Sequence, residues 1–122
     1  AVVDCLARNH DLVVLDTGRT LARAATPFQR QLIMTGLTVR AVAATRVALP
    51  KESALSTGLV VRRGGPISAK DVARATDLPL IGVVPNLGDL AGLADRGQPP
   101  SLGGSWRRAC HQILDWCLSA GS

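Results

Sequence analysis

The segment LVVRRGGPISAKDVARATDLPLIGVVPN, residues 59–86, decides the fold class. A short run of glycine, leucine and valine that ends in Arg62, at 58–62, precedes a Gly-Gly-Pro loop, and a second apolar run at 79–84 stops at Pro85. Between the two runs, Ser68 and Asp71 form an S-x-x-D pattern, a variant of the capping box, which predicts a helix reaching Thr76. A strand, a helix and a second strand in this order form a crossover unit that joins parallel strands.

The same alternation continues upstream of this segment. An apolar run at 31–35 ends at Gly36, and Thr38 is the expected N-cap of a helix over 39–49 that Pro50 stops. The stripe of this helix that is expected to face the core consists of Val39, Val42, Ala43 and Val47. Still further upstream, DLVVLD at 11–16 is a continuous apolar run between two aspartates, which predicts a strand covered on both faces.

Helices are also expected at 1–8, 87–95 and 105–118. One face of the last helix carries Trp106, Cys110, Ile113 and Cys117, with Leu114 beside it. We expect this face to pack against the sheet, and insertion at a membrane interface is the alternative. Strands that alternate with helices predict the α/β class, here a three-layer α/β/α domain with a mostly parallel sheet. The expected domain covers residues 1–120, with 121–122 as a cloning remnant.

The composition excludes several classes of protein. The chain has 122 residues, which suffices for one domain. Aromatic residues make up 2% of it, too few to build the stacking platforms of single-strand nucleic-acid readers. Neither a long uncharged apolar run nor a signal peptide is visible, so a cytoplasmic location is expected. The net charge of +5 gives modest support for an acidic partner, with solvated surface charge as the alternative.

The sequence contains no recognisable metal or catalytic set. Cys5, Cys110 and Cys117 form no C-x-x-C motif and are expected to be small core residues of a reduced protein. Neither His10 nor His111 has a second histidine at helical spacing. A single glutamate excludes paired-glutamate chemistry, and no nucleophile elbow occurs.

Four segments, in matching order and spacing, resemble the deviant-Walker ATPases of the MinD/ParA class. DLVVLDTG at 11–18 resembles a Walker B strand followed by D-T-P-P-G, and LTVRAVAATRVA at 37–48 resembles the family's P-E-x-x-A-x-x-x-A-x-R helix. Residues 59–86 resemble its V-V-N-R block with I-S-x-x-D-V and L-P-L-L-G-x-I-P, and LADRGQPP at 93–100 resembles x-N-R-G-E-P. The chain is most similar to the CpaE-like branch of actinobacteria known as septum-site-determining proteins, which are encoded beside pilus or secretion ATPases.

The resemblance implies a set of nucleotide-site residues. Asp16 corresponds to the carboxylate that holds Mg²⁺ through water, and Thr17 and Gly18 correspond to the switch II loop, whose two prolines are replaced here by Gly18 and Arg19. On the side of the nucleotide base, the resemblance implies Arg62, Pro85 and Asn86. Arg62 stands where the family has the asparagine that reads adenine.

The family's phosphate-binding loop is not found in this sequence. No G-x-x-x-x-G-K-[ST] motif occurs, and neither Lys51 nor Lys70 follows a glycine-rich turn. We therefore expect the chain to be the C-terminal part of a longer protein and not to hydrolyse ATP by itself. The resemblance implies ATP and Mg²⁺ as cofactors of the full-length parent, whereas no cofactor is expected for these 122 residues.

The leading functional hypothesis is a regulatory domain in septum placement, cell division or polar positioning of pilus or secretion machinery, acting through protein partners. A homodimer is an option, as are contacts with a membrane or with the DNA backbone, which are not favoured. The basic pairs available for an anionic partner are Arg62 with Arg63 and Arg107 with Arg108. The first alternative is an active, ATP-dimerised positioning ATPase. The second is a doubly wound binding module without a nucleotide; a receiver is the weakest candidate, since Asp16 has no acidic neighbour.

Overall fold

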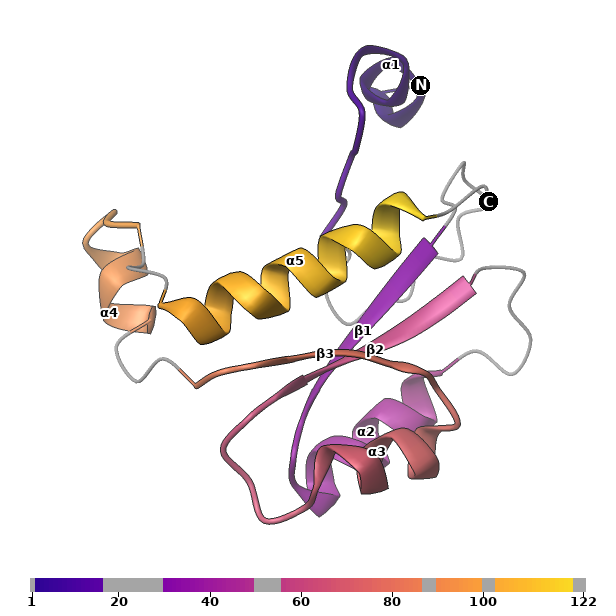
Figure 1. Ribbon diagram of the computed structural model, residues 1–122, viewed down its shortest axis with the longest axis vertical. Coiled ribbons are helices and arrows are strands. Elements are labelled where there is room, and N and C mark those ends of the chain that lie inside the picture. Colours follow the sequence, from indigo (N-terminus) through magenta and orange to yellow (C-terminus); the bar gives the residue numbers. More distant parts are fainter. Residues whose placement is uncertain (1, 17–29, 50–55, 87–89, 100–102, 120–122) are drawn as a thin grey trace.

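Among the described residues, three parallel strands form a sheet (Figure 1). The computed structural model describes residues 2–16, 30–49, 56–86, 90–99 and 103–119. The strands are β1 (Arg30–Gly36), β2 (Ser56–Arg62) and β3 (Leu80–Val84), and they lie in the order β1-β2-β3. Arg62 pairs with both Gly36 and Val84, so the three strands end at one shared edge of the sheet.

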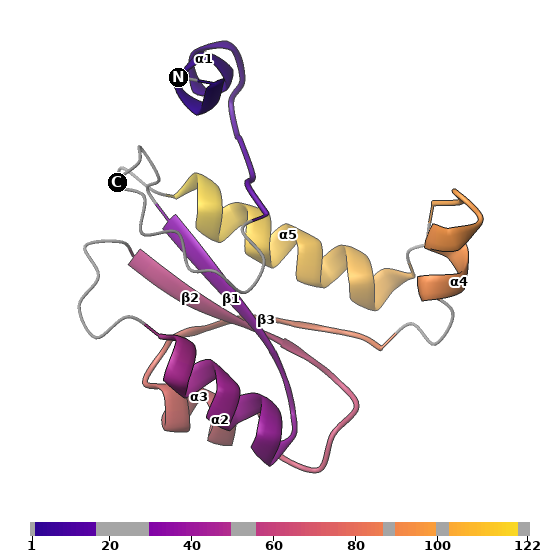
Figure 2. The same cartoon turned by 180° about the vertical axis from the view of Figure 1, so that it is seen from behind.

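Helices lie against both faces of this sheet. The crossover helices α2 (Val39–Ala48) and α3 (Ala69–Thr76) lie side by side on one face, and α5 (Gly104–Leu118) lies on the other (Figures 1 and 2). The first two share a face because both crossovers run in the same direction along the sheet with the same handedness. The predicted α/β class and the parallel pairing are therefore confirmed for the described strands.

The predicted helix starts at Thr38 and Ser68 are confirmed in atomic detail. The hydroxyl of Thr38 accepts a hydrogen bond from the backbone N–H of Ala41 at 3.1 Å, and that of Ser68 accepts one from Asp71 at 3.2 Å. These bonds satisfy backbone donors that the first turn of a helix leaves free. At its other end, α3 is closed by Asp77 in the left-handed conformation.

The central strand β2 connects two hydrophobic clusters. Leu59 and Val61 point to the α2 and α3 side, where they pack with Leu37 and Val72. Val60 points to the opposite side and packs with Val84 and Ala109 of α5. Neighbouring residues of a strand face opposite sides of its sheet, so three consecutive apolar residues serve both clusters. Full burial of the Leu59, Val60 and Val61 side chains contributes roughly 1.5–3 kcal/mol each to stability.

A close fit between Trp116 and the sheet positions the C-terminal half of α5. A Cβ atom on Gly58 would overlap Ile81 and lie 3.1 Å from the Trp116 ring. The Arg30 guanidinium stacks over the Trp116 indole, 4.5 Å from the ring centroid. It also donates hydrogen bonds to the hydroxyls of Ser56 and Ser119, at 3.5 and 3.4 Å. Cation–π stacking and these bonds hold α5 at the amino end of β1.

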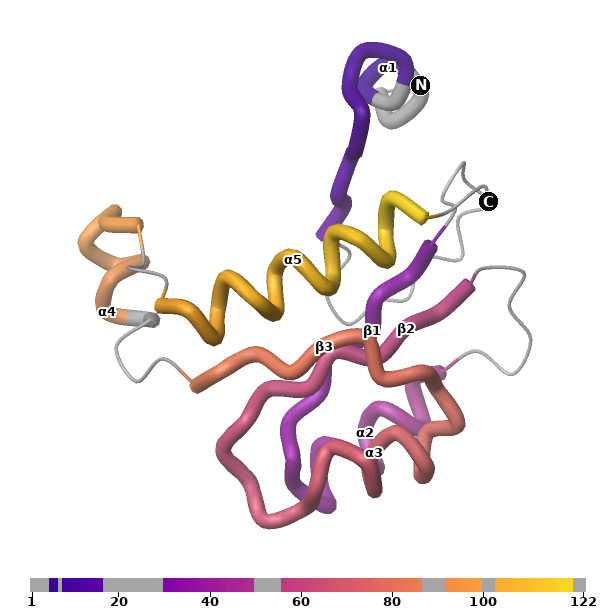
Figure 3. Tube along the Cα trace, viewed as in Figure 1, coloured from indigo at the N-terminus to yellow at the C-terminus, as the bar shows by residue number. Residues whose placement is uncertain are grey.

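The strand predicted at 11–16 is not formed. Helix α1 (Val2–Asn9) agrees with the helix predicted at 1–8, but residues 10–16 continue from it as an irregular segment (Figure 3). Val14 is 77% exposed, and Leu12 and Leu15 are exposed as well. An apolar run has the composition of a strand, but a strand also needs a neighbour for its backbone hydrogen bonds, and none of the described strands pairs with this run.

The core-facing side of α2 also differs from the prediction. Val42 packs against the cluster around Leu59, whereas Val39, Ala43 and Val47 are exposed. The alanine-rich helix has several apolar faces of similar width, and packing against β1 and α3 selects the side that includes Ala41 and Thr45. Periodicity alone did not distinguish these faces.

The burial of the cysteines and the set of residues on the apolar face of α5 also differ from the prediction. Cys5 and Cys110 are exposed, and Cys117 is half-buried, so the first two are not core residues. The α5 face that meets the sheet carries Trp106, Ala109 and Ile113, and Cys110 lies outside it. The expected packing of this helix against the sheet is nevertheless confirmed.

Helix α4 (Leu90–Asp95) covers part of the helix predicted at 87–95. Residues 87–89, 120–122 and Pro50 lie outside the described ranges.

Candidate functional site

The carboxyl edge of β2 and β3 is the place where the chain paths diverge. After β2 the chain turns to α3 on one face of the sheet, and after β3 it continues through α4 to α5 on the other face. In open α/β sheets, ligands bind outside the carboxyl ends of strands where successive connections leave to opposite sides. The loops at this edge are therefore the candidate functional site.

The loops that follow β2 and β3 are in direct contact. The backbone N–H of Arg63 donates a hydrogen bond to the carbonyl oxygen of Val84 at 2.9 Å, which continues the strand pairing by one residue. Gly64 then adopts φ 121°, and a Cβ atom at this position would lie 3.3 Å from the side-chain nitrogen of Asn86. Glycine permits both the positive φ angle and the close approach of Asn86.

The loop that follows β1 packs against the loop that follows β2. The backbone N–H of Ile67 donates a hydrogen bond to the carbonyl oxygen of Leu37 at 3.2 Å. A Cβ atom on Gly65 would overlap that carbonyl group, so only glycine fits between the two loops. Three loops that are distant in sequence thus form one packed unit. Gly64 and Gly65 were not among the predicted site residues, although a glycine pair between a strand and a capped helix was a visible signal.

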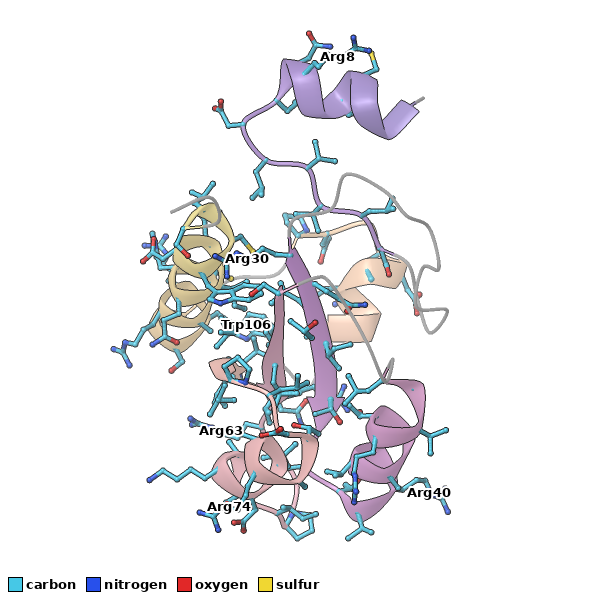
Figure 4. The ribbon with its side chains drawn as sticks, turned by 90° about the vertical axis from the view of Figure 1, so that its right-hand side faces the viewer. Arg8, Arg30, Arg40, Arg63, Arg74 and Trp106 are labelled. Atoms are coloured by element: carbon cyan, nitrogen blue, oxygen red, sulfur yellow. The ribbon has the colours of Figure 1, made fainter. Side chains whose placement is uncertain are left out.

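The structure brings the predicted base-side residues together. Arg62 is the last residue of β2 and pairs with Val84, directly before Pro85 and Asn86. Arg62 and Asn86 are exposed, and Pro85 is half-buried. Arg63 is exposed beside them (Figure 4). Within the described part of the chain, the guanidinium groups of Arg62 and Arg63 have no hydrogen-bond or ion-pair partner, so both are available to an anionic group.

The second basic pair lies toward the same end of the sheet. Helix α5 begins near the end of β3, and Trp106 in its first turn packs against the cluster that contains Val84 (Figure 1). Arg107 and Arg108 follow Trp106 and are exposed. The carboxyl end of β3 is therefore flanked by basic residues from the β2 loop and from α5.

The predicted Mg²⁺ ligand does not belong to this group of loops. Asp16 is exposed and lies in the irregular segment after α1, outside the described strands. Thr17, Gly18 and Arg19 lie outside the residues that the structure describes. In the described ranges no group of three or more His, Cys, Asp or Glu side chains could hold a metal ion.

The cysteine closest to the sheet lies at the opposite edge. Burial raises the pKa of the Cys117 thiol, and the positive charge of Arg30 acts in the other direction as the smaller effect. A raised pKa disfavours the thiolate, which is the reactive form. Cys117 thus contributes to packing near Trp116 and is a poor candidate for a nucleophile.

No family model, curated protein or solved structure matches this chain. Among the helices that the structure describes, none has the length and apolar character needed to cross a bilayer.

Proposed function

We propose that this chain is a regulatory domain of the MinD/ParA type, similar to septum-site-determining proteins, that acts by binding other proteins and not by hydrolysing ATP. Its partners belong to the cell-division machinery or to the pilus and secretion machinery, and it acts at the septum or at a cell pole. The fold then corresponds to the C-terminal portion of a three-layer P-loop-like domain. The proposal is supported by four motif segments in family order.

One observation carries the proposal. Gly64 packs on Asn86, which joins the two loops that the resemblance assigns to the nucleotide base. The same loops carry Arg62 where adenine-reading relatives have asparagine, and Asp16 is an exposed residue of the irregular segment after α1. A site that keeps its loop scaffold but has lost its base-reading residue and its adjacent carboxylate favours binding over catalysis.

Calorimetric titration of MgATP into the chain tests the nucleotide part of the proposal. We expect no binding in the micromolar range, because neither a lysine-bearing phosphate loop nor a carboxylate adjoins Arg62 among the described residues. Micromolar affinity would overturn this expectation. If ATP does bind, Arg62→Ala and Asn86→Ala should weaken it, whereas Arg74→Ala, an exposed cation on α3, serves as the matched control.

Phosphate release by a full-length protein that contains the chain tests the ATPase alternative. Under the regulatory proposal, turnover is absent both with Asp16 and with the Asp16→Ala variant. Turnover that Asp16→Ala abolishes would instead establish an ATPase. In cells, deletion of the protein is expected to displace septa or polar machinery, and unchanged septum positions together with unchanged pilus and secretion function would contradict the proposed role.

A further inference from the structure

The outward face of α2 carries two strongly exposed valines. Val39 is 74% exposed and Val47 is 87% exposed, the highest values for large apolar residues in the described helices and strands. Ala43 lies between them and is exposed as well. The three residues are spaced at i, i+4 and i+8, so they form one continuous stripe along the helix.

Helix stability does not explain these valines. β-Branched residues lose side-chain freedom in a helix, and alanine or lysine at a solvent-facing position would favour the helix more. Core packing does not explain them either, because Val42 already supplies the contact between α2 and the cluster around Leu59 and Val61. The stripe therefore points to a contact outside the described residues.

Two arginines flank the stripe. At 3.6 residues per turn, Arg40 and Arg46 project on opposite sides of the stripe, Arg40 near its N-terminal end and Arg46 near its C-terminal end. Both are exposed, and neither has a hydrogen-bond or ion-pair partner in the part of the chain that the structure describes. Arg40 points away from the sheet (Figure 4). Helix α2, VRAVAATRVA, contains no acidic residue, so its outward face is apolar at the centre and positive on both sides.

This combination selects the chemistry of the partner. A nucleic acid would supply phosphates for the arginines but no apolar surface for the valines. A second copy of the same face would oppose arginine with arginine, because a two-fold interface pairs a surface with itself. An amphipathic helix with an apolar stripe between two rows of carboxylates satisfies both features at once.

We propose that the outward face of α2, formed by Val39, Ala43, Val47, Arg40 and Arg46, is a docking surface for an acidic amphipathic helix of a partner protein. Apolar side chains of the partner cover the valines, and its carboxylates pair with the two guanidinium groups. This surface shares no residue with the carboxyl-edge loops. The inference therefore holds whether or not those loops bind a nucleotide.

Fluorescence anisotropy with a labelled synthetic peptide tests the inference on the whole chain. The probe is a helix of about four turns with leucine at every third or fourth position and glutamate on both sides of the leucine stripe. We expect it to bind and to shift the backbone amide resonances of α2. A peptide of the same pattern with lysine in place of glutamate should not bind.

Two double variants separate the apolar and the ionic parts. Val39→Asp with Val47→Asp should weaken peptide binding about tenfold or more, and so should Arg40→Glu with Arg46→Glu. Leu118→Asp is the matched control, since Leu118 is an exposed apolar residue on α5, across the sheet. All five substituted side chains are exposed, so circular dichroism should show the native fold in each variant.

Three outcomes would overturn the inference. The first is no binding of the glutamate peptide at about 1 mM, which is weaker than a specific helix contact. The second is equal binding of the lysine peptide. The third is undiminished affinity in either folded double variant, or resonance shifts confined to elements other than α2. None of these outcomes bears on the ATP titration, so the two proposals can fail independently.

Discussion

At the residue scale, the position of α5 depends on the absence of a side chain at Gly58. The Trp116 ring and Ile81 occupy the space that a Cβ atom on Gly58 would take. Gly58→Ala should therefore lower the free energy of unfolding by about 1–3 kcal/mol, the range typical of an overpacked core. The midpoint of urea unfolding measures this change. Gly104→Ala is the control, because no atom lies within 4 Å of its Cβ position and α5 should be equally stable or slightly more so.

Cys117 should make stability depend on alkaline pH. Burial raises the pKa of its thiol, so the folded chain keeps a proton that the unfolded chain releases. Stability from this group is complete below the ordinary thiol pKa and declines as pH rises through that value toward the folded one. Urea midpoints at a series of pH values above about 8 should therefore fall less steeply for Cys117→Ala than for the unmodified chain. The exposed Cys110→Ala should reproduce the unmodified slope, and identical slopes in all three proteins would contradict the prediction.

At the scale of single elements, the start of α3 depends on one hydroxyl. Ser68 accepts the backbone N–H of Asp71, and α3 carries Val72, which is fully buried against β2. Ser68→Ala should cost about 1 kcal/mol of unfolding free energy, whereas Ser68→Asp should retain most of it because aspartate also caps helices. Thermal unfolding followed by circular dichroism measures both. Ser105 lies in the first turn of α5 and makes no such capping bond among the described residues. Ser105→Ala should therefore leave the free energy of unfolding unchanged.

Elements with boundary signals were predictable from the sequence, and elements that depend on a distant partner were not. The caps at Thr38 and Ser68 and the proline after β3 define helices and strands locally, so these were predicted correctly. Residues 11–16 have the composition of a strand, but pairing with another segment is not encoded in that run alone. Similarly, α2 was predicted as a helix, but the side that it buries depends on how α3 and β1 pack against it.

The candidate site was likewise predictable from the sequence only in part. Arg62, Pro85 and Asn86 could be placed together, because neighbouring parallel strands end at one edge of a sheet. The contacts of Gly64 with Asn86 and of Gly65 with Leu37 could not, since they depend on loop conformations that spacing does not determine. The stacking of Arg30 on Trp116 joins residues far apart in the sequence and had no local signal.

At the scale of the whole molecule, the described N-terminal residues stand apart from both hydrophobic clusters. Neither cluster contains a residue from 2–16, and Leu6, Leu12 and Leu15 are exposed. Removal of residues 1–16 should therefore change the free energy of unfolding by less than about 1 kcal/mol, the size of typical surface effects. Urea unfolding with tryptophan fluorescence measures this through α5. A loss of several kcal/mol would show that these residues support the sheet after all.

The order β1-β2-β3 also has a kinetic consequence. Each strand pairs with its neighbour in the sequence, and β2, α3 and β3 together span residues 56–84. Contacts between segments close along the chain cost little loop-closure entropy, so this unit is suited to form first during folding. Helix α5 docks later, because the surface that Trp116 and Ala109 contact exists only once β2 and β3 have paired. The face that carries α5 is therefore completed last and is the first to open when the protein unfolds.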